Sequence, residues 1–225
     1  MIFRMLWWRI RYAAWHLAWR IETRVAQWRT LYGVKVGVAA VFDEQIAARA
    51  FESVEAALGL IAQYEPRRLC RITRDIEHIW VRRAAYAPAY YVEELRQCVV
   101  DREFLTAEDT APAMVAVAIV HEATHARLFK NRIPYTEAIR PRVEALCDEQ
   151  TAAFARHLPD GESLARRIVH GRAADPAHWS NESLDRRLVE AKHLEVEAAR
   201  RELEDSDLPL WLKKLLRRVI RSRAA

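Results

Sequence analysis

The sequence predicts an α+β protein that is mainly helical and contains a small antiparallel sheet. Only 5 of the 225 residues are glycine, which argues against a barrel or sandwich built on many tight turns. Apolar residues recur at helical spacing through most of the chain, and strand-like patterns are confined to residues 32–42, 75–82 and 89–101. A chain of this length can bury a sizeable core, and 52% hydrophobic residues fit a globular protein.

The expected elements of the first half follow from capping and breaking residues. Residues 32–42 form a short strand or a connector. Asp43 can cap a helix over residues 43–64, which Pro66 ends. Residues 75–82 and 89–101 are two strands, and the short link between them predicts a β-hairpin.

The second half is predicted to be helical. Pro112 suits the first turn of a helix over residues 111–130, and Pro141 opens a helix that continues to residue 157. A short helix ends at residue 170, with Gly171 as its cap. Ser180 begins a long helix to residue 205, whose many charged residues indicate a solvated face.

The two ends differ from the body of the chain in charge. Residues 1–30 and 205–225 together have a net charge of +9, whereas residues 31–204 have −4. Basic ends on a slightly acidic body indicate an anionic partner such as a membrane surface. We expect no nucleic-acid binding, because the body lacks a basic–aromatic recognition motif.

The N-terminal segment, residues 1–30, combines tryptophan with arginine. Five of the 8 tryptophans lie within the first 28 residues. This mixture is typical of a helix in the lipid headgroup layer, and docking of the tryptophan face on the body is an equal alternative. The arginines interrupt every apolar run, so we expect neither a spanning helix nor a signal peptide.

The C-terminal segment, residues 206–225, predicts a basic amphipathic helix, with apolar residues such as Trp211 and Leu215 on one face and Lys213, Lys214 and Arg217 on the other. It can bind a membrane, a partner protein or the body of the chain. The body, residues 31–205, is then one domain between two terminal helices. Three cysteines without an obvious pairing fit a reducing compartment, so we expect a cytoplasmic protein, peripheral on the inner membrane face if the ends bind lipid.

The chemistry is expected on the helix at 111–130, which contains the sequence His-Glu-Ala-Thr-His. His121 and His125 are four residues apart, so both imidazoles lie on one face of a helix and can reach one ion. Glu122 lies close enough to act on a water molecule beside that ion. This spacing is typical of zinc hydrolases, and we expect zinc as the cofactor.

A third ligand is expected on the following helix. Glu144 and Asp148 are also four residues apart and share one face. Glu144 can bind the metal, and Asp148 can then accept a hydrogen bond from the outer N–H of a ligating imidazole. Glu149 is the rival ligand but has no aspartate four residues later. Cys147 is expected to be an inert buried thiol, although it lies near enough to be an accidental ligand.

The pattern of these residues resembles the gluzincin (thermolysin-like) metallopeptidases over residues 75–157. In that family a His-Glu-x-x-His helix is followed by a helix with a ligating glutamate and an aspartate four residues after it, which matches His121, His125, Glu144 and Asp148. The resemblance implies a zincin-like domain whose edge strand holds an extended peptide. It also makes Tyr135, in the loop between the two ligand helices, the first candidate to stabilise the oxyanion.

The implied function is hydrolysis of peptide bonds in a peptide or protein substrate. Zinc activates a water molecule, and Glu122 serves as its general base. Weaker candidates for the oxyanion donor are His157, His170 and His178. Two other functions stay open: a membrane-associated scaffold with a structural or vestigial zinc site, and a zinc hydrolase that acts on a substrate other than peptides.

Overall fold

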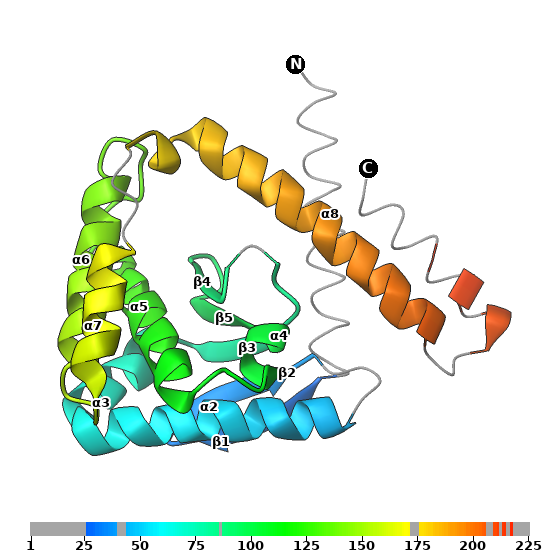
Figure 1. Cartoon of the computed structure of the whole chain (residues 1–225), viewed down its shortest axis with the longest axis horizontal. Coiled ribbons are helices and arrows are strands. Elements are labelled where there is room, and N and C mark those ends of the chain that lie inside the picture. Colours follow the sequence, from blue (N-terminus) through cyan, green and yellow to red (C-terminus); the bar gives the residue numbers. More distant parts are fainter. Residues whose placement is uncertain are drawn as a thin grey trace.

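The structure is a computed structural model that describes residues 26–39, 44–85, 87–171, 176–205, 209–211, 213, 214 and 217. It is a mixed α+β fold that is mainly helical (Figure 1). The strands are β1 (Gln27–Leu31), β2 (Val34–Val38), β3 (His78–Arg82), β4 (Ala89–Val92) and β5 (Gln97–Asp101). The helices are α2 (Glu44–Tyr64), α3 (Pro66–Asp75), α4 (Arg102–Thr106), α5 (Pro112–Lys130), α6 (Arg140–Ala155), α7 (Gly161–His170) and α8 (Asn181–Asp205), with a 3-10 turn η1 (Pro176–Trp179) before α8.

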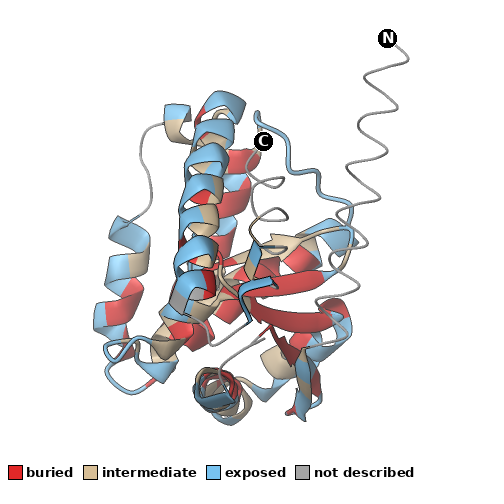
Figure 2. Ribbon diagram, turned by 90° about the vertical axis from the view of Figure 1, so that its right-hand side faces the viewer, coloured by how far each residue is buried: buried red, intermediate tan, exposed pale blue. Residues whose placement is uncertain are grey.

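The five strands form one mixed sheet in the order β1-β2-β3-β5-β4. The three inner strands, β2, β3 and β5, run parallel, whereas the edge strands β1 and β4 pair antiparallel with their neighbours. Parallel strands are usually covered on both faces, and β3 and β5 accordingly have four buried residues each. Figure 2 shows the inner strands largely coloured as buried, whereas most residues of β1 and β4 are exposed or of intermediate burial.

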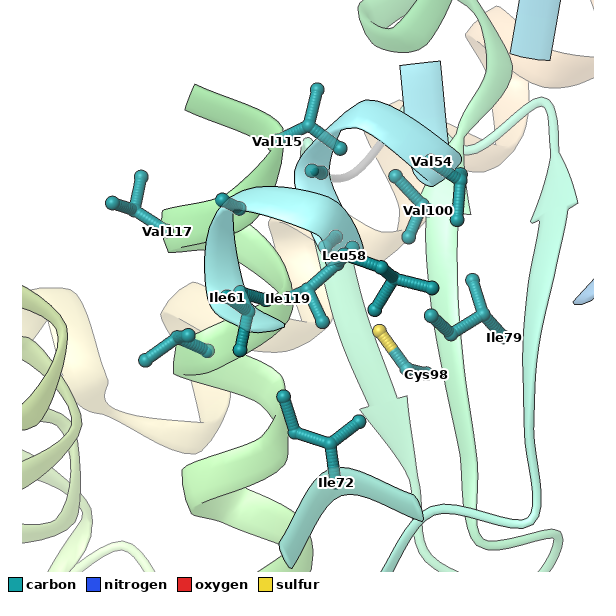
Figure 3. Packing of buried hydrophobic residues seen from close by; sticks show 14 of the residues in the cluster. Val54, Leu58, Ile61, Ile72, Ile79, Cys98, Val100, Val115, Val117 and Ile119 are labelled. Atoms are coloured by element: carbon teal, nitrogen blue, oxygen red, sulfur yellow. The ribbon is translucent and has the colours of Figure 1, made fainter. Parts of the chain in front are cut away.

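Successive residues of each inner strand point to opposite faces of the sheet, as the pleat of a strand requires. Ile79 and Val81 belong to the main core, which α2 and α5 cover, while Trp80 belongs to a smaller cluster on the other face. Figure 3 shows the main core, where side chains of α2, α3 and α5 meet those of β3 and β5. The site-bearing helix α5 is therefore held on the sheet by its apolar first half.

A tight hairpin joins β1 to β2. Leu31 pairs with Val34, which leaves Tyr32 and Gly33 as a two-residue loop, and both have a positive φ. Positive φ at both positions is the mark of a type I′ turn, the turn whose twist suits a hairpin. The hairpin keeps Gly37 against the indole rings of the second face: a Cβ there would lie 2.6 Å from Trp80.

Most expected elements are confirmed. The strand at 34–38, the helix from 44 to 64, the strand at 78–82, and the helices α5 to α8 fall within a few residues of their predicted bounds. Pro112 and Pro141 each lie in the first turn of a helix, as predicted. Helix α6 packs on α5, and α7 packs on α6 (Figure 1). The expected ligand helix, α6, therefore lies beside the expected motif helix, α5.

The predicted hairpin between residues 75–82 and 89–101 is wrong, and so is the antiparallel sheet. The second run is two strands, separated by a turn at Glu93–Arg96 in which Arg96 has a positive φ. Both β3 and β4 pair with β5, and β3 does so in parallel. The apolar residues of β3 and β5 are buried on both faces, so these two strands occupy the interior and β4 takes the edge.

One boundary differs from the prediction, and one helix was not predicted. Residues 27–30, assigned to the N-terminal helix, lie in β1, where Trp28 stacks on the second face of the sheet. Pro66 follows the end of α2 at Tyr64, as predicted, and it also begins a further helix, α3, because proline is favoured in the first turn, where its missing N–H leaves no bond unmade. The rest of the N-terminal helix prediction, residues 1–25, lies outside the described residues.

The described part of the C-terminal segment is helical at residues 210, 211, 213, 214 and 217. Leu210 and Trp211 are exposed, and the guanidinium of Arg217 pairs with Glu204 near the end of α8. Whether this segment binds a membrane stays a prediction. In the part of the chain that the structure describes, no helix combines the length and apolarity needed to cross a membrane.

Candidate metal centre

The two motif histidines meet on α5. Their Nε2 atoms are 3.3 Å apart, and both rings are partly buried. The arrangement follows from the four-residue spacing, which stacks both side chains on one face of the helix. The preceding residues of α5, from Val115 to Val120, are almost all buried against the core, and this fixes the direction in which the histidine face points.

Glu144 of α6 brings its carboxylate to both imidazoles. One carboxylate oxygen lies 3.3 Å from Nε2 of His121, and the other lies 3.5 Å from Nε2 of His125. Its side chain is only 9% exposed. Zinc bonds of about 2.0–2.1 Å at a tetrahedral angle place two ligand atoms about 3.3–3.4 Å apart. The separation of the two ring nitrogens and that of each nitrogen from its nearest carboxylate oxygen are close to this value, so the three side chains are near enough to bind one small cation.

Cys147 is the residue that the sequence reasoning undervalued. It is fully buried on α6, and its sulfur and the ring nitrogens of His121 and His125 all lie within 4.8 Å of one another. These three residues form a group that can hold a metal ion. The signal was present in the sequence, because Cys147 follows Glu144 by three residues and therefore shares its face of the helix.

The charges of this site are strongly coupled. Burial acts to lower the pKa of His121, but its hydrogen bond to Glu144 and the negative charges of Glu122, Glu144 and Asp148 raise that pKa to about 9. Burial acts to raise the pKa of Glu144, yet hydrogen bonds from His121, His125 and Tyr135 bring it well below its usual range. A proton on the His121 imidazole thus offsets part of the negative charge of the carboxylates, and a divalent cation in its place would offset more of it.

Glu122 lies next to the ligands but is buried, 7% exposed. Burial raises the pKa of its carboxyl, and the adjacent negative charge of Glu144 adds to the rise, while His121 and His125 act against it. A main-chain hydrogen bond from Tyr91 of β4 also favours the ionised form. A raised pKa is what a general base needs in order to accept a proton near neutral pH.

Tyr135 forms a hydrogen bond with the expected metal ligand Glu144. Its hydroxyl donates to Oε1 of Glu144, and its ring stands edge-on to His125 at 5.5 Å. The buried guanidinium of Arg140 lies 5.1 Å from the centre of the tyrosine ring and donates to Asn181 at the start of α8. In this position Tyr135 holds the carboxylate, and its expected role as oxyanion donor stays a prediction.

Asp148 lies on the far side of the first histidine. Its Oδ1 is 3.5 Å from Nδ1 of His121, so it faces the outer nitrogen of that ring, as the four-residue spacing from Glu144 led us to expect. The rival ligand Glu149 is exposed on α6. The weaker histidines lie elsewhere: Nδ1 of His157 contacts Glu65, His170 contacts a carbonyl of its own helix, and His178 contacts Arg187.

The edge strand β4 borders the site. It ends the strand order of the sheet, and the main chain of Tyr91 reaches Glu122 from it. The ring of Tyr91 also lies 6.4 Å from Phe129 near the end of α5. An edge strand provides main-chain donors and acceptors along which an extended peptide can lie.

A cavity of about 1000 Å³ lies away from these ligands, between residues 83–85, 87 and 88, α4, the start of α5, α7 and α8. Its lining mixes arginines such as Arg83 and Arg201 with acids such as Asp109 and Glu197. None of the expected metal ligands lines it. The candidate site thus rests on the side chains that converge between α5 and α6, not on this cavity.

No protein-family model matches the chain, and comparison with curated proteins and with solved structures finds no match either. The gluzincin resemblance therefore rests on the motif and its spacing alone.

Proposed function

We propose that this protein is a zinc-dependent metallopeptidase whose metal is held by His121, His125 and Glu144. The observation that carries the proposal is the convergence of two imidazole nitrogens and one carboxylate at 3.3–3.5 Å, with a buried glutamate beside them. Three protein ligands leave the fourth tetrahedral position for a water molecule, which is the pattern of catalytic sites. Zinc bound there would lower the pKa of its water ligand and polarise the scissile carbonyl.

The residues of the chain have separate tasks in this proposal. Glu122 takes the proton of the attacking water and passes it to the leaving amine, and its raised pKa suits both steps. The hydrogen bond from Tyr91 keeps that carboxylate in place. Asp148 orients the ring of His121, and Tyr135 holds Glu144 and stays the first candidate to stabilise the oxyanion.

The substrate class follows from the position of β4. In the part of the chain that the structure describes, β4 is an edge strand of the sheet, and an edge strand suits an extended segment of a peptide or protein next to Glu122. The three cysteines form no disulfide among the described residues, which agrees with a cytoplasmic location. The basic C-terminal segment would bring the enzyme to the inner face of a membrane that contains anionic lipid.

The test combines metal titration with hydrolysis of a library of fluorescence-quenched peptides. Glu122→Gln should keep its zinc affinity and lose hydrolysis by a factor of about 10²–10⁴, because it keeps the shape of the side chain but removes the base. Glu144→Ala should bind zinc at least tenfold more weakly. The matched control is Glu149→Gln, which changes an exposed glutamate of the same helix and should leave the zinc affinity unchanged. Unchanged zinc affinity in Glu144→Ala would contradict the ligand assignment.

One observation favours the alternative of a structural zinc site in a scaffold protein. Cys147 lies beside the histidines, and a site with four protein ligands has no open position. The two functions differ in the role of Glu122. In a peptidase it is the general base, whereas a structural zinc site needs no base. Wild-type protein that binds one zinc and cleaves none of the peptides would favour the scaffold.

A further inference from the structure

Helix α6 offers the metal two ligands on one face. Glu144 and Cys147 are three residues apart, and both side chains are buried toward α5. Glu144 already lies 3.3–3.5 Å from the histidine nitrogens. The sulfur of Cys147 and the same histidine rings fall within a wider limit of 4.8 Å. Both residues are therefore near enough to the histidines to bind the same metal ion.

The sulfur is close enough to become a ligand after a small movement. Zinc–sulfur bonds of about 2.3 Å and zinc–nitrogen bonds of about 2.1 Å at a tetrahedral angle place the two ligand atoms about 3.6 Å apart. Because the sulfur lies no more than 4.8 Å from the ring nitrogens, it needs to move by at most roughly 1 Å. Its helix holds it on the correct face, and no part of the hydrolytic mechanism uses this thiol.

We propose that Cys147 binds the metal as a fourth protein ligand in a closed state of the site, in the place that water takes in the open state. This inference rests on the proposed metal site and adds a means of regulation to it. In the change to the closed state the S–H bond breaks, a sulfur–metal bond forms and water leaves the metal. The proton goes to the carboxylate of Glu122, and no electron is transferred, so no oxidant is required.

The closed state has two consequences that the open state lacks. Hydrolysis stops, because neither an activated water nor a free base remains. The site also binds thiolate-seeking cations more tightly than a site of two histidines and a carboxylate would, since soft ligands select soft metals. A soft cation such as Cd²⁺ should therefore drive the site into the closed state.

The experiment uses the full chain with Cys70→Ser as the reference protein, because Cys70 is an exposed thiol that would bind soft cations in solution. Cobalt(II) is titrated into this protein and the sulfur-to-cobalt charge-transfer absorption is recorded. We expect the band in the reference protein and its loss in Cys147→Ser. The matched control is Cys98→Ser, which removes a second fully buried thiol outside the ligand group and should keep the band.

Affinity gives a second readout that does not depend on activity. We expect Cys147→Ser to bind Cd²⁺ at least tenfold more weakly, while its zinc affinity falls much less. In a Glu144→Ala background, loss of Cys147 should remove the zinc affinity that remains. If the Cys147 variant fails to fold, X-ray absorption of the cobalt-loaded reference protein must show a sulfur neighbour of the metal.

The outcomes separate this inference from the proposed function. Bound cobalt without a sulfur signal, or a band that persists in Cys147→Ser, overturns the role of Cys147 and leaves the peptidase proposal intact. A sulfur signal in the reference protein, together with no peptide cleavage by zinc-loaded Cys147→Ser, supports Cys147 and counts against the peptidase, because that variant cannot form the closed state. Failure to bind any metal overturns both.

Discussion

The hydrogen bond from Tyr135 to Glu144 makes a specific prediction about metal affinity. In Tyr135→Phe the ring and its edge-on contact with His125 remain, but the hydroxyl that donates to Oε1 of Glu144 is lost. The carboxylate then has one donor fewer to hold its orientation between the two histidines. The change is confined to one oxygen atom, so any effect reports on that hydrogen bond.

The size of the effect can be worked out from the contact. A hydrogen bond to a charged acceptor contributes about 1.5–3 kcal/mol, and the lower end applies because Tyr135 is 37% exposed. Since about 1.4 kcal/mol corresponds to a factor of ten, zinc affinity should fall roughly tenfold. Loss of residues that orient metal ligands typically costs about 10- to 100-fold in affinity, which agrees with this value.

The assay is a competition titration against a chromophoric zinc chelator. Tyr32→Phe is the matched control, because it removes the same hydroxyl from the exposed β1–β2 turn. Hydrolysis is measured at saturating zinc, so that weaker binding does not lower the rate. An unchanged zinc affinity with a tenfold or greater fall in kcat would refute this reasoning. That result would assign Tyr135 to the reaction itself, as an oxyanion donor.

Three further predictions concern stability and the chain end. Asp75 is buried and accepts bonds from Arg74 and Lys130 at 2.7–2.9 Å, which lower its pKa from 3.8 to about 2. Asp75→Asn should cost about 1–2 kcal/mol at pH 7 in urea unfolding, allowing for screening of the two exposed partners, and the difference from wild type should vanish as the pH falls through the folded-state pKa toward 2. Gly37→Ala should lower stability by about 1–3 kcal/mol, because the new methyl group would meet an indole ring at 2.6 Å, and an unchanged melting temperature would contradict the packing of that face. Deletion of residues 208–225 should weaken binding to vesicles that contain anionic lipid, and equal sedimentation with vesicles would exclude this segment as the membrane contact.

Local features of the fold were predictable from the sequence. The strand at 34–38, the strand at 78–82 and the helices α5, α6 and α8 follow from apolar periodicity and from proline at helix starts, which act over a few residues. The pairing of the strands was not predictable in the same way. The short link after residue 82 suits a hairpin, but pairing depends on which strands can be buried on both faces, and that depends on α2 and α5.

The sequence by itself determined the proximity of His121 and His125, because one turn of helix places residues four apart on the same face whatever surrounds them. It also determined that Glu144, Cys147 and Asp148 share a face of α6. Only the tertiary structure decided that this face meets the histidines, since the contact depends on how two helices are rotated and packed. The same packing brings the carboxylate of Glu144 to 3.3–3.5 Å from the histidine nitrogens and the sulfur of Cys147 to within 4.8 Å of them.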